Sequence, residues 1–352
     1  MASSVPAQKF FERREPVLFI LGAFFLLGLP LCLVGATRPW LLDRSHLGTL
    51  YFILVGNTHF LLTFALYFQS QNLSYFRSTN SRVLLYIAIP IFIFAFFDIY
   101  RTLNIATLYP TFDRGFVIAV RLFNFYHFGR QSFGVLQLFK RRAGAVSGVW
   151  GRRVENGFFF TLVALMLVTF LNNGELALHS PVTLGLAGLA ASFFVTALIA
   201  LVRSGAGGLG IAYFIAQSVS GGFAIFRTYL YPFALAVHYV EYHVLMFPRC
   251  FETPLGSQPV DKVWGTLRES KLVFYTLLVF GAVVVSLMMA TAGRQWSPGT
   301  TMALSLFDGL FVFHFFVESL VWRFSEPYYR QTTLPLFFSA RVPAGQFAGA
   351  SR

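Results

Sequence analysis

The chain has 352 residues, of which 56% are hydrophobic and only 12% are charged, and its formal net charge is +13. Soluble domains are typically about 25% charged, so this composition excludes a soluble domain of ordinary size. It predicts an all-α fold: a polytopic bundle of transmembrane helices that forms a single integral membrane domain over residues 1–352.

Apolar windows long enough to span a bilayer divide the chain into ten expected helices. They cover residues 17–35, 47–68, 83–100, 116–139, 156–172, 182–202, 206–226, 231–247, 271–291 and 301–322. A basic arm (residues 1–15) precedes the first window, and a tail (residues 323–352) follows the last. The fifth window is short and a tight connection joins the seventh to the eighth, so nine or eleven spans stay open as alternatives.

The basic residues indicate how these helices are oriented. With the N-terminus in the cytoplasm, the segments on that side hold 19 of the 27 Lys and Arg residues, and the outer segments hold six. Because cytoplasmic loops are enriched in Lys and Arg, both the arm and the tail are expected in the cytoplasm. The net charge then needs no nucleic-acid partner and is mostly an orientation signal, helped by anionic membrane lipid.

The fourth window is the most polar. Asn124, His127 and Gln131 occupy positions i, i+3 and i+7, so they form one stripe along the helix. Arg130 is too central to reach water easily, so we expect it to need a carboxylate partner within the bundle and to belong to the catalytic residues.

Charged residues elsewhere in the windows are few and are expected to pair. Asp98 and Arg101 lie three residues apart near the outer end of the third window, which predicts a local ion pair. In the tenth window His314 and Glu318 are separated by four residues and therefore share one helix face.

The stretch from Tyr231 to Arg249 holds three ionisable groups near the middle of an apolar helix. His238 and Glu241 are neighbours on one face. His243 is displaced from His238 by roughly 140° around the helix, so it shares their pocket only if the helix bulges or the pocket wraps around it.

Five of the seven histidines fall inside windows, at similar depth on helices that run in the same direction; they are His59, His127, His238, His243 and His314. A lone histidine of this kind is usually a hydrogen-bonded packing residue. Four helices that each offer one instead predict that His59, His127, His238 and His314 converge on one metal ion. His243 would be a further ligand or a neighbour of the ligands, and the carboxylates Glu241 and Glu318 would orient them as catalytic residues. His46 and His179 lie in outer loops and are given no role.

The donor set indicates which metal would bind. Imidazole and carboxylate without thiolate suit Fe(II) best, and zinc or copper are alternatives. The chain lacks a nucleophile elbow, a phosphate-binding loop, an HExxH motif and a nucleotide fingerprint.

The mid-span histidines, together with the sequence YHFG at residues 126–129, resemble the Brp/Blh-type bacterial β-carotene dioxygenases. The resemblance implies transmembrane histidines that hold a ferrous ion, which activates dioxygen to cleave a polyene. The motif carries over one ligand, His127. Where that family has an acidic residue shortly after HFG, this chain has Arg130 and Gln131.

Three functions follow as hypotheses. The first is a non-haem iron oxygenase or oxidoreductase that acts on a lipophilic small molecule in the bacterial inner (plasma) membrane. The second is a proton-coupled transporter, in which Arg121 and Arg130 bind an anion and His–Glu pairs relay protons. The third is a non-catalytic membrane scaffold, which leaves the mid-span histidines unexplained. Metal bound to the purified protein separates the first hypothesis from the second.

The predicted orientation can be tested at the C-terminus. We expect a reporter enzyme that is active only in the periplasm to stay silent when it is fused after Arg352, because the basic residues place this end in the cytoplasm. Reporter activity in intact cells is the measurement, and strong activity would contradict the topology.

Overall fold

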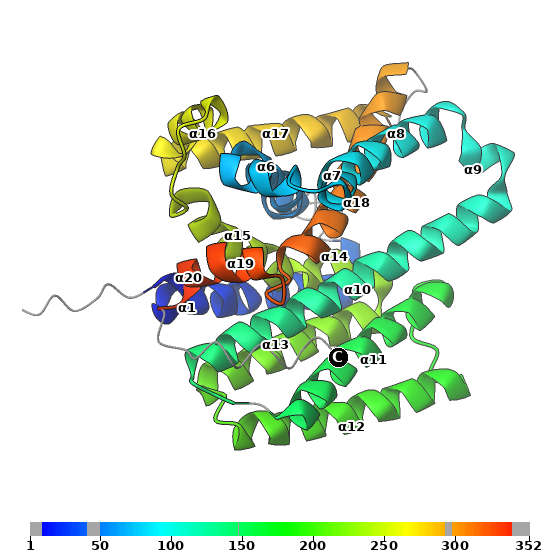
Figure 1. Ribbon diagram of the computed structural model, residues 1–352. Helices are drawn as coiled ribbons and strands as arrows, with labels where there is room; N and C mark the ends of the chain where they lie inside the picture. Colours follow the sequence, from blue (N-terminus) through cyan, green and yellow to red (C-terminus); the bar gives the residue numbers. More distant parts are fainter. Residues whose placement is uncertain (1–8, 41–49, 147, 293–297, 340–352) are drawn as a thin grey trace, which may run out of the picture. The chain divides into compact units, whose positions relative to one another are not determined.

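The computed structural model describes residues 9–40, 50–146, 148–292 and 298–339 (Figure 1). Within these ranges all regular elements are helical, and one isolated β-bridge joins Glu175 to Arg227. The all-α prediction is therefore confirmed. The ends of the predicted arm and tail, the start of the second window and His46 lie outside the described residues.

The chain divides into two compact units. Unit 1 comprises Met1–Gly48, Arg121–Val244 and Phe337–Arg341, and unit 2 comprises Thr49–Val120, Leu245–Leu336 and Val342–Arg352. Two of the boundaries fall inside helices α10 (Pro110–Arg142) and α15 (Ala236–Phe251). That all of these residues form a single membrane domain stays a prediction.

Unit 1 is built mainly from long helices. Besides its parts of α10 and α15, it contains η1 (Phe10–Glu12), α1 (Glu15–Ala23), η2 (Phe24–Gly28), α2 (Leu29–Thr37), α11 (Val149–Leu171), α12 (Pro181–Arg203), α13 (Gly207–Phe226), η6 (Thr228–Leu230) and α14 (Tyr231–Ala234).

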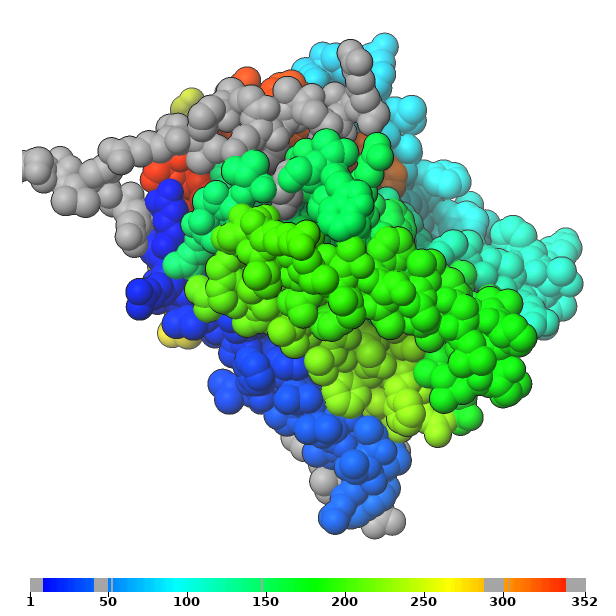
Figure 2. Space-filling view, turned by 90° about the horizontal axis from the view of Figure 1, so that it is seen from below, coloured from blue at the N-terminus to red at the C-terminus, as the bar shows by residue number. Residues whose placement is uncertain are grey.

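Glycines allow α11 to approach both of its neighbours closely. A Cβ atom at Gly157 would lie 3.0 Å from the Phe193 ring on α12, and one at Gly221 on α13 would lie 3.0 Å from Leu162. Small residues at such contacts are typical of packed membrane helices. The three helices therefore lie against one another, as the green segments of Figure 1 show and Figure 2 shows from below.

Unit 2 contains several short or irregular helices before α10, and its longest helices, α17 and α18, come after α15. The helices of unit 2 are η3 (Phe52–Asn57), α5 (Thr58–Leu62), η4 (Thr63–Phe68), α6 (Ser70–Phe76), α7 (Asn80–Val83), η5 (Leu84–Ala88), α8 (Ile89–Thr102), α9 (Ile105–Leu108), α16 (Pro259–Glu269), α17 (Lys271–Ala292), α18 (Pro298–Val321) and α19 (Pro327–Thr332). The short α20 (Leu334–Phe337) lies at the boundary between the units.

An ion pair fastens α8 to α18. Arg101 donates from Nε and Nη2 to Oδ2 of Asp308, at 2.9 and 2.5 Å. The carboxylate partner of Arg101 is thus Asp308 on another helix, where the sequence spacing had indicated Asp98. Close packing supports the contact, since a Cβ atom at Gly309 would lie 2.5 Å from the Phe94 ring.

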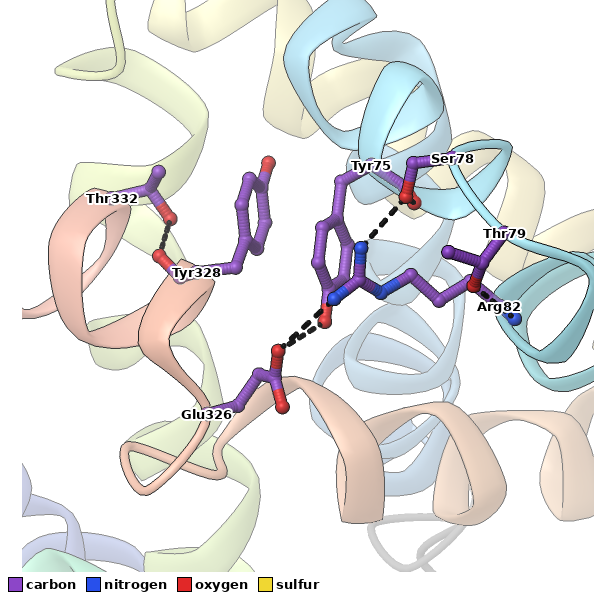
Figure 3. Close-up of polar contacts among 7 residues, drawn as sticks. All are labelled: Tyr75, Ser78, Thr79, Arg82, Glu326, Tyr328 and Thr332. Carbon is purple, nitrogen blue, oxygen red and sulfur yellow. Dashed lines mark hydrogen bonds and ion pairs between the residues drawn. The ribbon is translucent and has the colours of Figure 1, made fainter.

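The segment after α18 is tied to α6 and α7 by the contacts drawn in Figure 3. The rings of Tyr75 and Tyr328 stack in parallel, with centroids 3.8 Å apart. The Tyr75 hydroxyl donates to Glu326 Oε1 at 2.8 Å, and the Arg82 guanidinium lies 4.1 Å from the Tyr75 ring centroid. The first part of the predicted tail is therefore packed against α6 and α7 within unit 2.

Six helical segments among the described residues are long and apolar enough to cross a bilayer. They are Glu15–Thr37, Asn80–Thr102, Val149–Leu171, Pro181–Arg203, Gly207–Phe226 and Leu304–Val321. α16 and α17 add a seventh if this pair, bent by 98°, forms one span, and Ile53–Phe68 is a shorter apolar helix. Such helices fit an integral membrane protein. The windows 116–139 and 231–247 are also helical but fall outside this set, so the count of ten and the orientation stay predictions.

A buried ion pair joins α10 to α11 within unit 1. Lys140 Nζ donates to Glu155 Oε1, and Gln137 donates to Oε2 of the same carboxylate at 2.9 Å. The side chains of Lys140 and Glu155 are 3% and 0% exposed. Lys140 is one of the 19 basic residues that the predicted orientation assigns to the cytoplasmic side, and in the structure it is part of the core of unit 1.

Removing one member of this pair should destabilise the protein strongly. For Lys140→Met we expect a loss of about 3–5 kcal/mol, because the Glu155 carboxylate stays buried without its cation. The double variant Lys140→Met/Glu155→Leu should recover most of that loss. Thermal unfolding in detergent measures both. Arg153→Met on exposed α11 surface is the control, and a loss no greater than that of the control would contradict the role of the pair.

Candidate metal site

The first functional cluster lies in unit 2, where His59 and His314 meet. Their rings are 4.1 Å apart between centroids, and both side chains are fully buried. His59 sits on α5 between the π-helical turn η3 and the 3-10 turn η4. Such irregular turns are frequent at functional sites, since they change which residues share a helix face.

His314 is held from both sides of its ring. Its Nδ1 lies 2.6 Å from Thr63 Oγ1, and its Nε2 lies 3.0 Å from Glu318 Oε2. The predicted i, i+4 neighbourhood of His314 and Glu318 is confirmed. If Nδ1 carries the proton and donates to Thr63, the lone pair of Nε2 faces a carboxylate, an arrangement that a cation between them would stabilise.

His59, His314 and Glu318 fit a metal ion by chemistry and by spacing. Each is buried and offers a ligand atom, and these atoms lie within 4.8 Å of one another. Metal–ligand bonds of about 2.0–2.2 Å place donors on opposite sides of an ion about 4 Å apart. Side-chain shifts below about 1 Å would therefore bring all three donors into bonding range.

The second pair of histidines lies in unit 1. The rings of His127 on α10 and His238 on α15 meet edge to face, with centroids 5.0 Å apart, and both side chains are buried. The four histidines chosen from the sequence thus come together two by two, one pair in each unit. That all four share a single ion stays a prediction.

Glu241 is clamped by amide groups in unit 1. Gln131 donates from Nε2 to Glu241 Oε2 at 3.1 Å and to the His238 carbonyl oxygen at 3.0 Å, and Gln217 donates to Glu241 Oε1. Gln217 also donates from Nε2 to the Tyr213 hydroxyl oxygen at 3.2 Å. Gln131 lies on the stripe that the sequence predicts, and Gln217 is a further partner of Glu241 that was not among the predicted site residues. The i, i+4 spacing of Tyr213 and Gln217 on a small-residue face was the available signal.

The surroundings of two other predicted site residues, His243 and Arg130, are as follows, and the role of His243 as a further ligand stays a prediction. α15 runs as a regular helix from His238 to His243, and His243 is only half-buried, so no bulge turns it towards the His238 face. Arg130 is exposed, donates to Asn156 Oδ1 at 2.8 Å and lies 5.5 Å from the Phe133 ring centroid. The expected buried carboxylate partner of Arg130 is replaced by an amide and an aromatic ring.

No family model, curated protein or solved structure matches this chain. What the sites can do is therefore argued from their own side chains. The cluster in unit 2 offers imidazole and carboxylate groups that can bind a metal or exchange a proton. In unit 1, two amides fix the Glu241 carboxylate beside His238.

The two amide groups that donate hydrogen bonds to Glu241 should contribute to the stability of the fold. Gln217→Leu removes one donor from the buried Glu241 carboxylate, and we expect a loss of about 1.5–3 kcal/mol in unfolding free energy. Gln217→Leu/Glu241→Leu should lose less than Gln217→Leu alone, because the unpaired acceptor is gone. Ser218→Ala, one residue along α13, is the control and should change the free energy by less than about 0.5 kcal/mol. Equal losses for Gln217→Leu and the control would rule the clamp out as a stabilising contact.

Proposed function

We propose that this chain is an integral membrane protein that binds a metal ion through His59, His314 and Glu318 and acts as a non-haem iron oxygenase or oxidoreductase on a lipophilic substrate. One observation carries the proposal: three buried donors lie within 4.8 Å of one another on apolar helices. Polar groups in such surroundings are costly unless they are satisfied, and a shared ion would satisfy all three together.

The donor set supports iron. Two imidazoles and one carboxylate are the ligands of non-haem Fe(II) oxygenases, which leave open positions for other ligands. A ferrous ion held there would supply the activation of dioxygen. Thr63 holds the ring of His314 through Nδ1 and so leaves Nε2 directed at the ion, as partners of metal-bound histidines commonly do.

The surroundings of the site support a lipophilic substrate. Phe60 is 1% exposed and its ring centroid lies 5.3 Å from that of His314, and Phe311 and Phe315 pack edge to face at 4.3 Å in the same part of unit 2. Aromatic side chains packed in this way exclude water and provide apolar surroundings for an apolar molecule. The resemblance to Brp/Blh-type enzymes adds a polyene as the substrate class and the bacterial inner membrane as the location.

Proton-coupled transport is the second candidate. It is favoured by the 3.0 Å contact between His314 Nε2 and Glu318, because such a pair can exchange a proton without a metal. The two candidates make opposite predictions for metal content.

Metal content tests the proposal directly. We expect the purified protein, supplied separately with Fe(II), zinc and copper, to retain an ion, and His59→Ala and His314→Ala to lose it. Glu318→Gln should weaken metal binding by about 10–100-fold. Elemental analysis gives the ion-to-protein ratio. His179→Ala, in an exposed loop, is the matched control and should keep the ratio of the parent. Parent protein that retains none of the three metals would favour the transporter.

The same measurement tests the histidines of unit 1. If His127 is a further ligand, as the sequence predicts, His127→Ala should lower the ratio. An unchanged ratio in both His127→Ala and His238→Ala would leave the ion to the residues of unit 2 alone.

A further inference from the structure

A sharp elbow in unit 2 separates α16 from α17. The two helices meet at an angle of 98°, and Ser270 between them has an extended backbone conformation. Exposed apolar side chains on α17 include Leu272 (78%) and Phe280 (65%). If α17 crosses the bilayer, α16 runs along its surface, as interfacial helices with one apolar face do.

α16 is anchored in this position by Trp264. The Trp264 side chain is 2% exposed, stacks on Phe68 at 5.8 Å and meets the edge of Phe274 at 5.5 Å. The opposite face of α16 is polar and includes Lys262 and Thr266, both exposed. The elbow is therefore a fixed feature of unit 2 with a polar side.

A cavity of about 610 Å³ opens at this elbow. The ionisable and hydroxyl side chains that line it are Asp261, Lys262, Thr266, Arg268, Glu269 and Lys271. One of the two carboxylates is already engaged, since Asp261 accepts hydrogen bonds from the backbone N–H groups of Ser70 at 3.0 Å and Gln258 at 3.2 Å. Three cations thus face a cavity in which Glu269 is the other acidic group.

Two of the cations are held in place by the protein. Arg268 donates from Nη1 to the carbonyl oxygens of Thr253 at 2.6 Å and Cys250 at 3.3 Å, which uses one nitrogen of a guanidinium with five donor hydrogens. Lys271 Nζ lies 4.9 Å from the Phe247 ring centroid, a cation–π contact. Cations that the protein holds at a cavity can form charge-assisted hydrogen bonds with a bound anion.

We propose that this cavity binds the phosphate group of an anionic phospholipid, with its acyl chains along α17. Lys271 is the first residue of the apolar helix, so it marks the depth at which phospholipid phosphates lie. Exposed Leu272 and Phe280 continue from there as an apolar track. A free phosphate ion would contact the cations but not the exposed apolar side chains of α17. The inference is independent of the metal site.

The test compares two lipids and two double variants of the full-length protein in neutral detergent. We expect phosphatidylglycerol to bind more tightly than phosphatidylcholine of the same chain length. Lys262→Gln/Lys271→Gln should weaken binding of phosphatidylglycerol by about 30-fold, since each basic residue near an anionic lipid contributes about fivefold. Arg152→Gln/Arg153→Gln on α11 removes the same charge elsewhere and should leave binding unchanged. Native mass spectrometry counts the bound lipids.

Each other outcome overturns the proposal. Equal weakening by both double variants would mean general attraction by net charge, and equal binding of the two lipids would mean that the site does not recognise the net negative charge of an anionic lipid. Inorganic phosphate provides the last arm: if it displaces phosphatidylglycerol at millimolar concentration, the site is one for free phosphate. Lys262→Gln alone, at an exposed position, should give a partial loss, and matched thermal unfolding shows that the variants remain folded.

Discussion

The free-energy cost of placing a polar group among apolar helices governs both units of this protein. Three glutamates are buried, and each meets a different kind of partner: Glu155 the ammonium group of Lys140, Glu241 two amides and Glu318 the imidazole of His314. Because an apolar interior provides no water to replace a missing partner, Glu155 and Glu241 fix the helices that carry their partners, whereas the partner of Glu318 lies on its own helix, α18. The packing of α10, α11, α13 and α15 within unit 1 depends on these contacts.

The sequence identified most of the buried ionisable residues, although Arg130 is exposed and His243 is half-buried, and it was a poor guide to their partners. An ionisable group inside an apolar window is costly wherever the helix packs, so the rule found His59, His127, His238, His314 and both candidate glutamates, all of which are buried. Partners on the same helix could be read from spacing, as for His314 and Glu318. Partners on other helices depend on tertiary packing, which is why Asp308 as the partner of Arg101 and Asn156 as the partner of Arg130 were missed.

The irregular helix around His59 shows a second limit of predicting structure from hydropathy windows. A uniform α-helix places successive residues 100° apart, but residues 52–57 form a π-helical turn and residues 63–68 a 3-10 turn. A π turn rotates the residues that follow it relative to a uniform α-helix, so the face that carries Thr63 depends on the turn at residues 52–57. The contact of Thr63 with His314 follows from this local geometry, for which a hydropathy window carries no signal.

The choice between a metal site and a proton relay reduces to the position of one proton on His314. Metal binding requires the lone pair of Nε2, so Nδ1 must carry the proton and Thr63 must accept it. Nε2 then faces the Glu318 carboxylate at 3.0 Å, a contact between two acceptors that is favourable only with a cation between them. In a relay, Thr63 donates to Nδ1 instead, and Nε2–H donates to Glu318. The same three side chains can therefore support either chemistry, and a metal ion or a proton between His314 and Glu318 would distinguish the two.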